Sequence, residues 1–347
     1  MTIGLLIILS MVLFLPFTVK SVEHNLEYFL FIMGVSAAVV ARSLSTHTLL
    51  EIIRNPLLYF ISLAVLITGL LFTVLMNKIK KGIGIITQKL PFPLFVFLVI
   101  VVLGLASSII TAIIASLILV EIIHVLPVKQ NAKLRLAVVA CFSIGLGAAL
   151  TPIGEPLATI AITKLGADFW YLLNQLGIYI IPGIMSLGVF GAFYVKMDML
   201  PQVNGNGEEK QVEVEKKTGN YGEVFIRAFK IFVFIIALEL LGTGFKPLID
   251  IYVVSLDGAL LYWINMVSAV LDNATIAAAE ISPAMSALQV KAILIGLLVS
   301  GGMLIPGNIP NIVAASKLKI KSRDWARTGI PIGLVIMAAY FAVIFLF

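Results

Sequence analysis

The sequence predicts an all-α polytopic membrane protein with two inverted repeats, each containing a re-entrant hairpin and a broken transmembrane helix. Three observations predict this fold class. Hydrophobic residues make up 61% of the chain and charged residues 12%, whereas soluble domains contain roughly 45–50% and about 25%. Apolar runs near the ~18 residues that a spanning helix needs recur along the whole chain. Two of the longest runs are interrupted by similar proline-containing motifs.

Ten apolar spans are expected, joined by short polar loops. Residues 2–18 lack the basic start and the cleavage site of a signal peptide, so we expect a retained first helix. The longest runs contain interruptions, which we interpret as two hairpins (92–126 and 250–287) and two helices broken in the middle (132–168 and 288–318). The complete set of expected spans is 2–18, 26–41, 57–77, 92–126, 132–168, 170–195, 223–245, 250–287, 288–318 and 326–346.

The order helix, hairpin, broken helix, helix occurs twice, which divides the chain into four parts. These are N-terminal transmembrane helices (1–56), a first repeat (57–195), a linker (196–222) and a second repeat (223–347). Because the first repeat starts outside and the second inside, the two are inverted. Secondary transporters commonly use this plan. The linker contains an Asn-Gly-Asn-Gly stretch and mixed Glu and Lys, which is typical of a solvated connection, and a regulatory role for it stays open.

The distribution of Lys and Arg predicts the orientation. We expect a multi-pass protein of the plasma (cell inner) membrane, with the N-terminus outside and the linker 196–222 cytoplasmic, because basic residues concentrate in cytoplasmic loops. The same bias explains the net charge of +6 without nucleic acid. Of the 24 Lys and Arg residues, this orientation leaves outside only Arg42, Arg54, Lys164, Lys246 and Lys291.

Two proline-containing motifs mark a candidate site. Residues 151–156 read Thr-Pro-Ile-Gly-Glu-Pro, and residues 305–311 read Ile-Pro-Gly-Asn-Ile-Pro-Asn. Paired prolines remove backbone donors and interrupt a helix. Unpaired backbone groups at membrane depth are tolerated only around a buried or water-filled cavity. Ordinary proline kinks are the structural alternative.

The motifs and the expected hairpin tips carry hydroxyl, amide and carboxylate groups, which are hard oxygen ligands suited to sodium. A carboxylate at membrane depth costs at least about 2.5–3.5 kcal/mol, so we interpret Glu155 and Asp272 as sodium ligands. A helix cap is the alternative for Asp272, and a structural role for Glu155. The polar residues concerned are Ser107, Ser108, Thr111, Thr151, Glu155, Asp272, Asn273, Thr275, Asn308 and Asn311.

Three further glutamates interrupt apolar runs. We expect Glu121 and Glu280 to lie near the membrane surface in contact with solvent. Glu239 is deeper, and either relays protons or pairs with a polar neighbour on another helix. No Lys or Arg accompanies the deep polar residues in this interpretation.

Residues 270–275 (Val-Leu-Asp-Asn-Ala-Thr) and the two proline motifs resemble the ion transporter superfamily. That group includes arsenite permeases, NhaD-type sodium/proton antiporters and sodium-coupled dicarboxylate carriers, together with a small prokaryotic branch of uncharacterised cation transporters. The resemblance covers the chain from about residue 57. It implies a homodimer with an elevator-like moving domain, in which hairpin tips and broken-helix loops hold sodium and substrate. Transferred by motif, the site comprises Thr111, Thr151, Gly154, Glu155, Asp272, Asn273, Gly307, Asn308 and Asn311.

We therefore expect a secondary transporter of small ions, most simply a sodium/proton antiporter in which both ions compete for buried carboxylates. Sodium-coupled symport of a small anion is the alternative. Dicarboxylate carriers have Ser-Asn-Thr at both tips, whereas here the first tip lacks Asn and the second has Asp272 before Asn273, which argues against an organic anion. An intramembrane acid/base enzyme would leave the repeat unexplained, so we expect no enzyme and no cofactor besides sodium. The expected partners are the small ion, the lipid bilayer and a second subunit.

Overall fold

The computed structural model describes the chain over most of its length. The described residues are 1–19, 21–22, 25–55, 58–59, 62–63, 66–67, 69–71, 74, 90–126, 128–196, 221–266 and 273–346. Within them the secondary structure is helical and includes no strand. Four helices are long and apolar enough to cross a membrane, namely α6 (Phe92–Ile110), α8 (Gln130–Ala148), α10 (Tyr171–Lys196) and α16 (Ser322–Phe345). The expectation of an all-α membrane protein is therefore confirmed.

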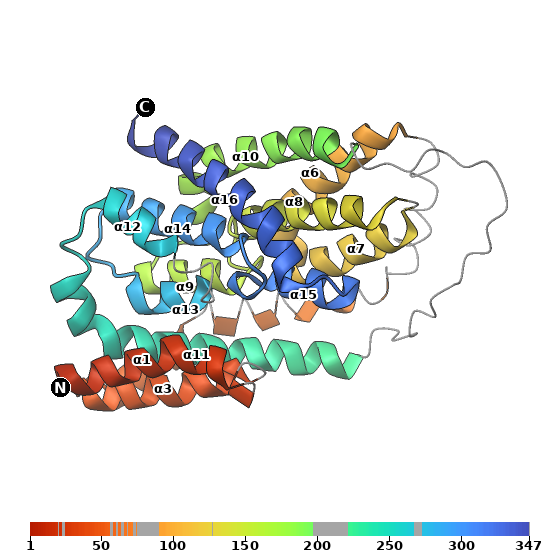
Figure 1. Cartoon of the computed structure of the whole chain (residues 1–347). Coiled ribbons are helices and arrows are strands. Elements are labelled where there is room, and N and C mark those ends of the chain that lie inside the picture. The colour runs from red at the N-terminus through yellow and green to blue at the C-terminus, as the bar shows by residue number, and fades with distance from the viewer. Residues whose placement is uncertain are drawn as a thin grey trace.

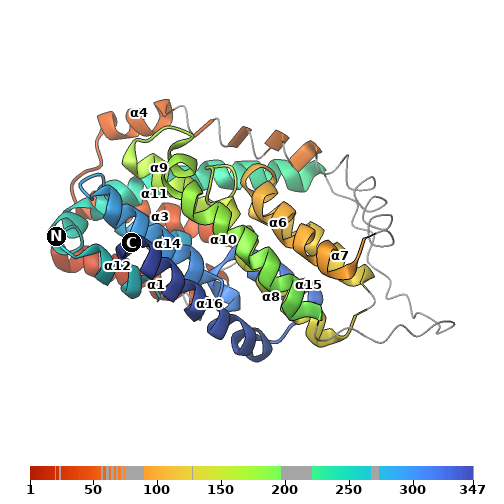
Figure 2. The same cartoon turned by 90° about the horizontal axis from the view of Figure 1, so that it is seen from above.

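One group of helices forms a layer along one side of the molecule. The long helix α11 (Tyr221–Tyr252) lies along α3 (Leu26–Val40), and α1 (Thr2–Thr18) packs beside them (Figure 1). The contact between α3 and α11 is close, since an added Cβ at Gly34 would lie 2.7 Å from the Ala237 carbonyl oxygen. Small residues at such contacts let helix backbones approach each other in membranes. The short helix α4 (Thr46–Arg54) contacts α11 at the edge of the molecule (Figure 2).

The remaining helices form a second group on the other side of α11 (Figure 1). Seen from above, α6, α10 and α16 run side by side in a similar direction (Figure 2). Two short helices follow α6 and α8, namely α7 (Ala112–Val125) and α9 (Pro156–Leu165). The later part of the chain adds α12 (Gly258–Ile264), α13 (Asn273–Glu280), α14 (Ala287–Gly301), the 3₁₀ turn η2 (Ile305–Gly307) and α15 (Ile309–Leu318).

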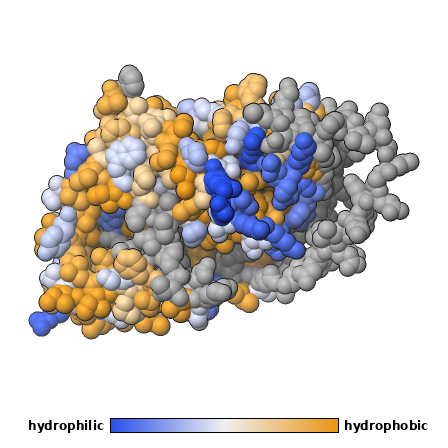
Figure 3. Space-filling model, in the orientation of Figure 1, coloured by the Kyte–Doolittle hydropathy of each residue, from blue (hydrophilic) through white to orange (hydrophobic). Residues whose placement is uncertain are grey.

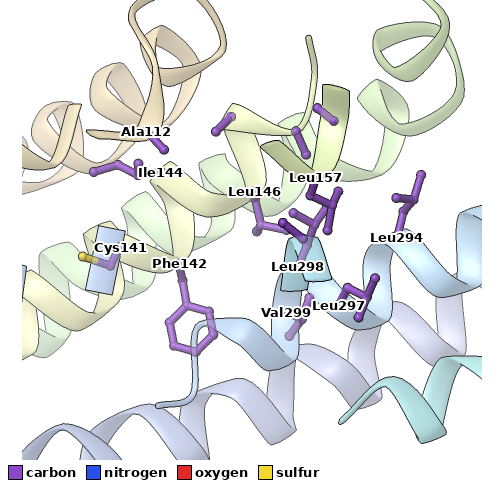
Figure 4. Close-up of a cluster of buried hydrophobic side chains, with 14 of the residues drawn as sticks. Ala112, Cys141, Phe142, Ile144, Leu146, Leu157, Leu294, Leu297, Leu298 and Val299 are labelled. Atoms are coloured by element: carbon purple, nitrogen blue, oxygen red, sulfur yellow. The ribbon is translucent and has the colours of Figure 1, made fainter. Parts of the chain in front are cut away.

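Within this second group, short helices from one half of the chain pack against short helices from the other half. Helix α7 packs against α15, and α13 packs against α9, so each half of the chain contacts the other at its short helices. Figure 4 shows part of the shared core, in which Leu146 of α8, Leu157 of α9 and Leu298 of α14 point toward one another. All three side chains are buried. The core that these three helices share is therefore apolar at this place.

The outer surface fits a membrane setting. Hydrophobic side chains cover most of the described surface seen in Figure 3, and hydrophilic side chains gather on one part of that face. Exposed apolar side chains recur along the helices, for example Ile178, Phe193 and Val335. A surface of this composition is stable in lipid.

Several expected boundaries differ from the structure. The span 223–245 is too short, because α11 continues through Pro247 to Tyr252. Helix α4 was not expected; Ser45 begins it by accepting a hydrogen bond from the Thr48 amide. The span 57–77 is described only in part, and most of the linker lies outside the described residues.

Candidate functional site

A sharp turn at Thr111 separates α6 from α7. Thr111 alone lies between the two helices, and its backbone has φ 76° and ψ 150°. A positive φ is uncommon for a residue with a side chain. The Thr111 hydroxyl accepts a hydrogen bond from the Ile114 amide at 3.4 Å and thereby caps α7. Thr111 is buried, so this turn places a threonine oxygen inside the protein.

The first interruption lies between α8 and α9, at residues 149–155. Pro156 occupies the first turn of α9, where its missing N–H costs no hydrogen bond. Gly154 folds back onto the end of α8, since an added Cβ would lie 2.7 Å from the Ala148 carbonyl carbon. Thr159 Oγ1 donates to the Pro152 carbonyl at 2.7 Å and braces the loop. Glycine is therefore required at residue 154 by space.

Hydrogen bonds join the turn at Thr111 to this interruption. The Ala112 amide donates to the Gly154 carbonyl at 2.8 Å. The Thr151 hydroxyl donates to the Ser108 carbonyl at the end of α6. The two segments, separated by about 40 residues in sequence, thus form one unit. The structure brings together Thr111, Thr151, Gly154 and Glu155, as the sequence predicts.

Glu155 lies at the centre of this unit. It is the N-cap residue of α9, with an extended backbone, and only 4% of it is exposed. The positive end of a helix dipole favours a negative charge at such a position. Glu155 and Thr111 line a shared pocket, which α11 closes with Ile231, Phe234 and Ile235. The pocket therefore lies where the two groups of helices meet.

The second interruption lies between α14 and α15, at residues 302–308. Asn311 is fully buried, and its Nδ2 donates to the Gly301 carbonyl at 2.9 Å and the Leu304 carbonyl at 2.8 Å. The side chain thus satisfies backbone acceptors that the interrupted helix leaves open. Asn308 is 1% exposed, and its amide lies against Gly145 of α8, where an added Cβ would be 2.5 Å from Nδ2.

The two interruptions have the same local geometry. Helices α9 and α15 each have 10 residues. Their N-caps are extended, with φ −155° at Glu155 and −153° at Asn308, and their C-caps are left-handed, with φ 59° at Gly166 and 54° at Lys319. The preceding helices α8 and α14 both have a C-cap residue in the right-handed helical conformation. Glu155 and Asn308 therefore occupy corresponding positions.

Buried amide groups surround the second interruption. Among the described residues, Asn308 Oδ1, Asn311 Oδ1 and Asn273 Nδ2 are buried and have no hydrogen-bond partner. An added Cβ at Gly301 would lie 3.6 Å from Asn273 Nδ2 and 2.8 Å from the Gly307 carbonyl oxygen. The structure therefore brings Asn273, Gly307, Asn308 and Asn311 to the end of α14. Asp272 lies outside the described residues.

The two clusters are neighbours. Ile309, which directly follows Asn308, lines the same pocket as Thr111 and Glu155. Threonine, amide and carboxylate oxygens at such a place can hold a small hard cation. The helix N-termini of α9 and α15 also point into this region, and these attract negative charge.

Some polar contacts differ from the sequence-based expectation. Glu280 does not lie in solvent, because its Oε1 accepts a hydrogen bond from Asn265 Nδ2 at 3.2 Å and its Oε2 is buried. Glu239 Oε1 accepts a hydrogen bond from Asn55 Nδ2 at 2.9 Å, which fits the expected pairing with a polar neighbour. Lys164 was expected near the outer surface, yet its Nζ donates to the Ala278 and Ile281 carbonyls. In the sequence, only the position of Lys164 near the end of an apolar helix could have indicated a contact with the carbonyls of another helix.

Comparisons with known proteins give two findings. No curated protein matches the sequence. A family model described as "Protein of unknown function (DUF1646)" matches residues 2–347. Since that match covers nearly the whole chain, the protein belongs to the DUF1646 family.

Proposed function

We propose that the protein is a secondary active transporter of small cations, most simply a sodium/proton antiporter. The observation that carries this proposal is the position of Glu155. A buried carboxylate lies at an interrupted helix, in a pocket shared with the Thr111 turn and closed by α11. Hard oxygen ligands of this kind favour sodium over soft metals.

Competition at one carboxylate couples the two ions. A carboxylate in a buried pocket binds either a proton or a metal cation, and each stabilises it against the cost of burial. Sodium arriving at Glu155 therefore releases a proton, and a proton arriving releases sodium. Exchange of the two ions follows if the pocket opens to one side of the membrane at a time.

The matched interruptions support an alternating-access mechanism. We infer that α6 to α10 and α11 to α16 belong to inverted repeats and that α6 and α7 form a re-entrant hairpin. The second hairpin, expected over 250–287, would have α12 and α13 in its two arms. Inverted repeats let the two halves exchange conformations around a central site. In this proposal the second group of helices, which includes α7, α9, α13 and α15, moves as an elevator against the layer of α1, α3 and α11. The resemblance to the ion transporter superfamily extends the proposal to a homodimer in the plasma membrane.

Sodium-coupled symport of a small anion is the second candidate. One observation favours it: the N-cap residue of α15 is the neutral Asn308, so that helix N-terminus keeps its attraction for an anion. Glu155, at the N-terminus of α9, would repel the same anion unless a bound cation neutralised it. Cation exchange needs no such compensation and is therefore the primary proposal.

Reconstitution tests the proposal directly. Purified protein in liposomes that contain a pH dye receives an inward sodium gradient. An antiporter moves protons outward, so the lumenal pH rises, and Glu155→Gln abolishes the rise. Glu121→Gln, a glutamate on α7 that does not line the pocket, is the matched control and keeps it. No pH change with sodium, lithium or potassium would overturn cation antiport and favour sodium-driven anion uptake.

A further inference from the structure

A second pocket lies between α9, α11 and the segment after α13. Its polar lining includes Thr163 and Lys164 from α9, Glu239 and Thr243 from α11, and Ser282. None of these residues belongs to the cluster around Glu155. The pocket again spans the boundary between the two groups of helices, because α11 belongs to the layer and α9 does not.

The Lys164 side chain crosses this boundary. Its stem runs over Gly242 of α11, where an added Cβ would lie 2.9 Å from Lys164 Cε. Its Nζ reaches the C-terminal end of α13 and donates to the Ile281 carbonyl at 2.9 Å and to the Ala278 carbonyl. The negative end of the α13 dipole favours an ammonium there. One lysine therefore contacts helices from both groups.

Carboxylates surround this lysine without forming a close ion pair. Glu239 faces Lys164 from α11, and Glu280 faces it from α13. No carboxylate of the described residues lies within 4.0 Å of Lys164 Nζ. The other charged groups nearby are Lys246, which lines the pocket on α11, and Glu51 of α4, which acts on Glu239. A lysine and a glutamate thus line one pocket at a separation that a proton can cross by way of water.

The corresponding lysine of the other half lacks this setting. Lys317 occupies the same place in α15 that Lys164 occupies in α9, one residue before the helix end. Lys317 is exposed, whereas Lys164 is partly buried. If the lysine served only to end a ten-residue helix, both lysines would have similar surroundings. Only Lys164 is covered, so its burial needs another explanation.

We propose that Lys164 and Glu239 form a proton relay of the transporter, which carries protons between water and the site at Glu155 where sodium and protons compete. The two pockets are lined by successive turns of the same helices, with Thr159 and Lys164 on α9 and Ile235 and Glu239 on α11. This inference rests on the proposed antiport. The N–H bond of the Lys164 ammonium breaks, its electron pair stays on Nζ, and the proton passes to a water molecule in the pocket, which gives one of its own protons to a Glu239 carboxylate oxygen. Glu239 then gives the proton to water in the pocket, and the reverse steps reload Lys164. Movement of α9 against α11 would separate the pair and so link proton release to the conformation.

Two flux measurements on proteoliposomes separate this role from the cation site. Exchange of labelled against unlabelled sodium at equal pH reports cation binding and movement without net proton transfer. A sodium gradient with a lumenal pH dye reports proton coupling. Lys164→Gln is expected to lower sodium-driven proton movement at least about tenfold, while labelled-sodium exchange persists and keeps the pH dependence that competition at Glu155 gives it. Lys317→Gln is the matched control and is expected to change neither flux.

Lys164→Arg distinguishes proton exchange from a structural charge. Arginine keeps a cation for the α13 carbonyls but does not release its proton at any working pH. It is therefore expected to behave like Lys164→Gln, and restored proton movement in Lys164→Arg would refute the proposal. Glu239→Gln, which keeps an acceptor for Asn55, is expected to lose proton coupling as well. Proton movement that survives in Lys164→Gln would also overturn the inference, and absence of sodium exchange in the unaltered protein would instead refute the antiport itself.

Discussion

The interruption at Gly154 allows a quantitative prediction about the site. An alanine Cβ at residue 154 would lie 2.7 Å from both the carbonyl carbon and the Cα of Ala148, well inside the ~3.5–4.0 Å of favourable carbon contact. The obstacle is backbone, so a rotamer change cannot relieve it. The loop must move away from the end of α8. The Gly154 carbonyl then loses its alignment with the Ala112 amide, to which it is now joined at 2.8 Å.

The expected cost combines two contributions. Overpacking of this kind costs typically 1–3 kcal/mol, and loss of a buried backbone hydrogen bond adds about 1 kcal/mol. We therefore expect Gly154→Ala to lower the free energy of unfolding by about 2–4 kcal/mol. Because the same loop carries Glu155, sodium binding should weaken in parallel.

Gly166→Ala is the matched control on the same helix. Gly166 has φ 59° and no atom within 4 Å of an added Cβ, so only backbone strain of about 1–2 kcal/mol is expected. Reversible unfolding in detergent, with and without sodium, measures both variants. The reasoning would be refuted if Gly154→Ala destabilised the protein less than Gly166→Ala, or if it bound sodium with unchanged affinity.

Two further predictions concern the helices that support the site. Gly147→Ala should lower the free energy of unfolding by about 1–3 kcal/mol, because an added Cβ would lie 2.6 Å from the Gly104 carbonyl carbon of α6; thermal unfolding in detergent measures this, and unchanged stability would contradict it. Asn311→Ala should cost about 2–4 kcal/mol, because the Gly301 and Leu304 carbonyls both lose their donor. Asn311→Asp keeps the shape but removes the donor, so it should be no more stable than Asn311→Ala in the same assay.

The fold class and the location of the interruptions could be predicted from the sequence. Apolar composition dictates membrane helices, and Pro156 with Gly154 dictates a break at residue 155. The ends of the breaks were less predictable: α8 stops at Ala148, before the first proline of the motif. The loop is held instead by the Gly154 carbonyl, which accepts from the Ala112 amide, and by the Thr151 hydroxyl, which donates to the Ser108 carbonyl. These tertiary contacts leave no local signal in the sequence.

The environment of single polar side chains could not be predicted. Lys164 and Lys317 precede leucine at the ends of two similar helices, yet only Lys164 is covered by α11 and α13. Which neighbour covers a helix end depends on tertiary packing, which a single sequence does not display. Glu280 illustrates the same point, since its partner Asn265 comes from the segment after α12.

The central claim is that sodium and protons compete for Glu155, and equilibrium binding of labelled sodium across a pH series tests it most directly. For one shared carboxylate, the apparent dissociation constant should rise about tenfold for each pH unit below the pH at which the site is half protonated. Glu155→Gln should abolish sodium binding at every pH. Sodium binding that is independent of pH, or that survives unchanged in Glu155→Gln, would contradict the account.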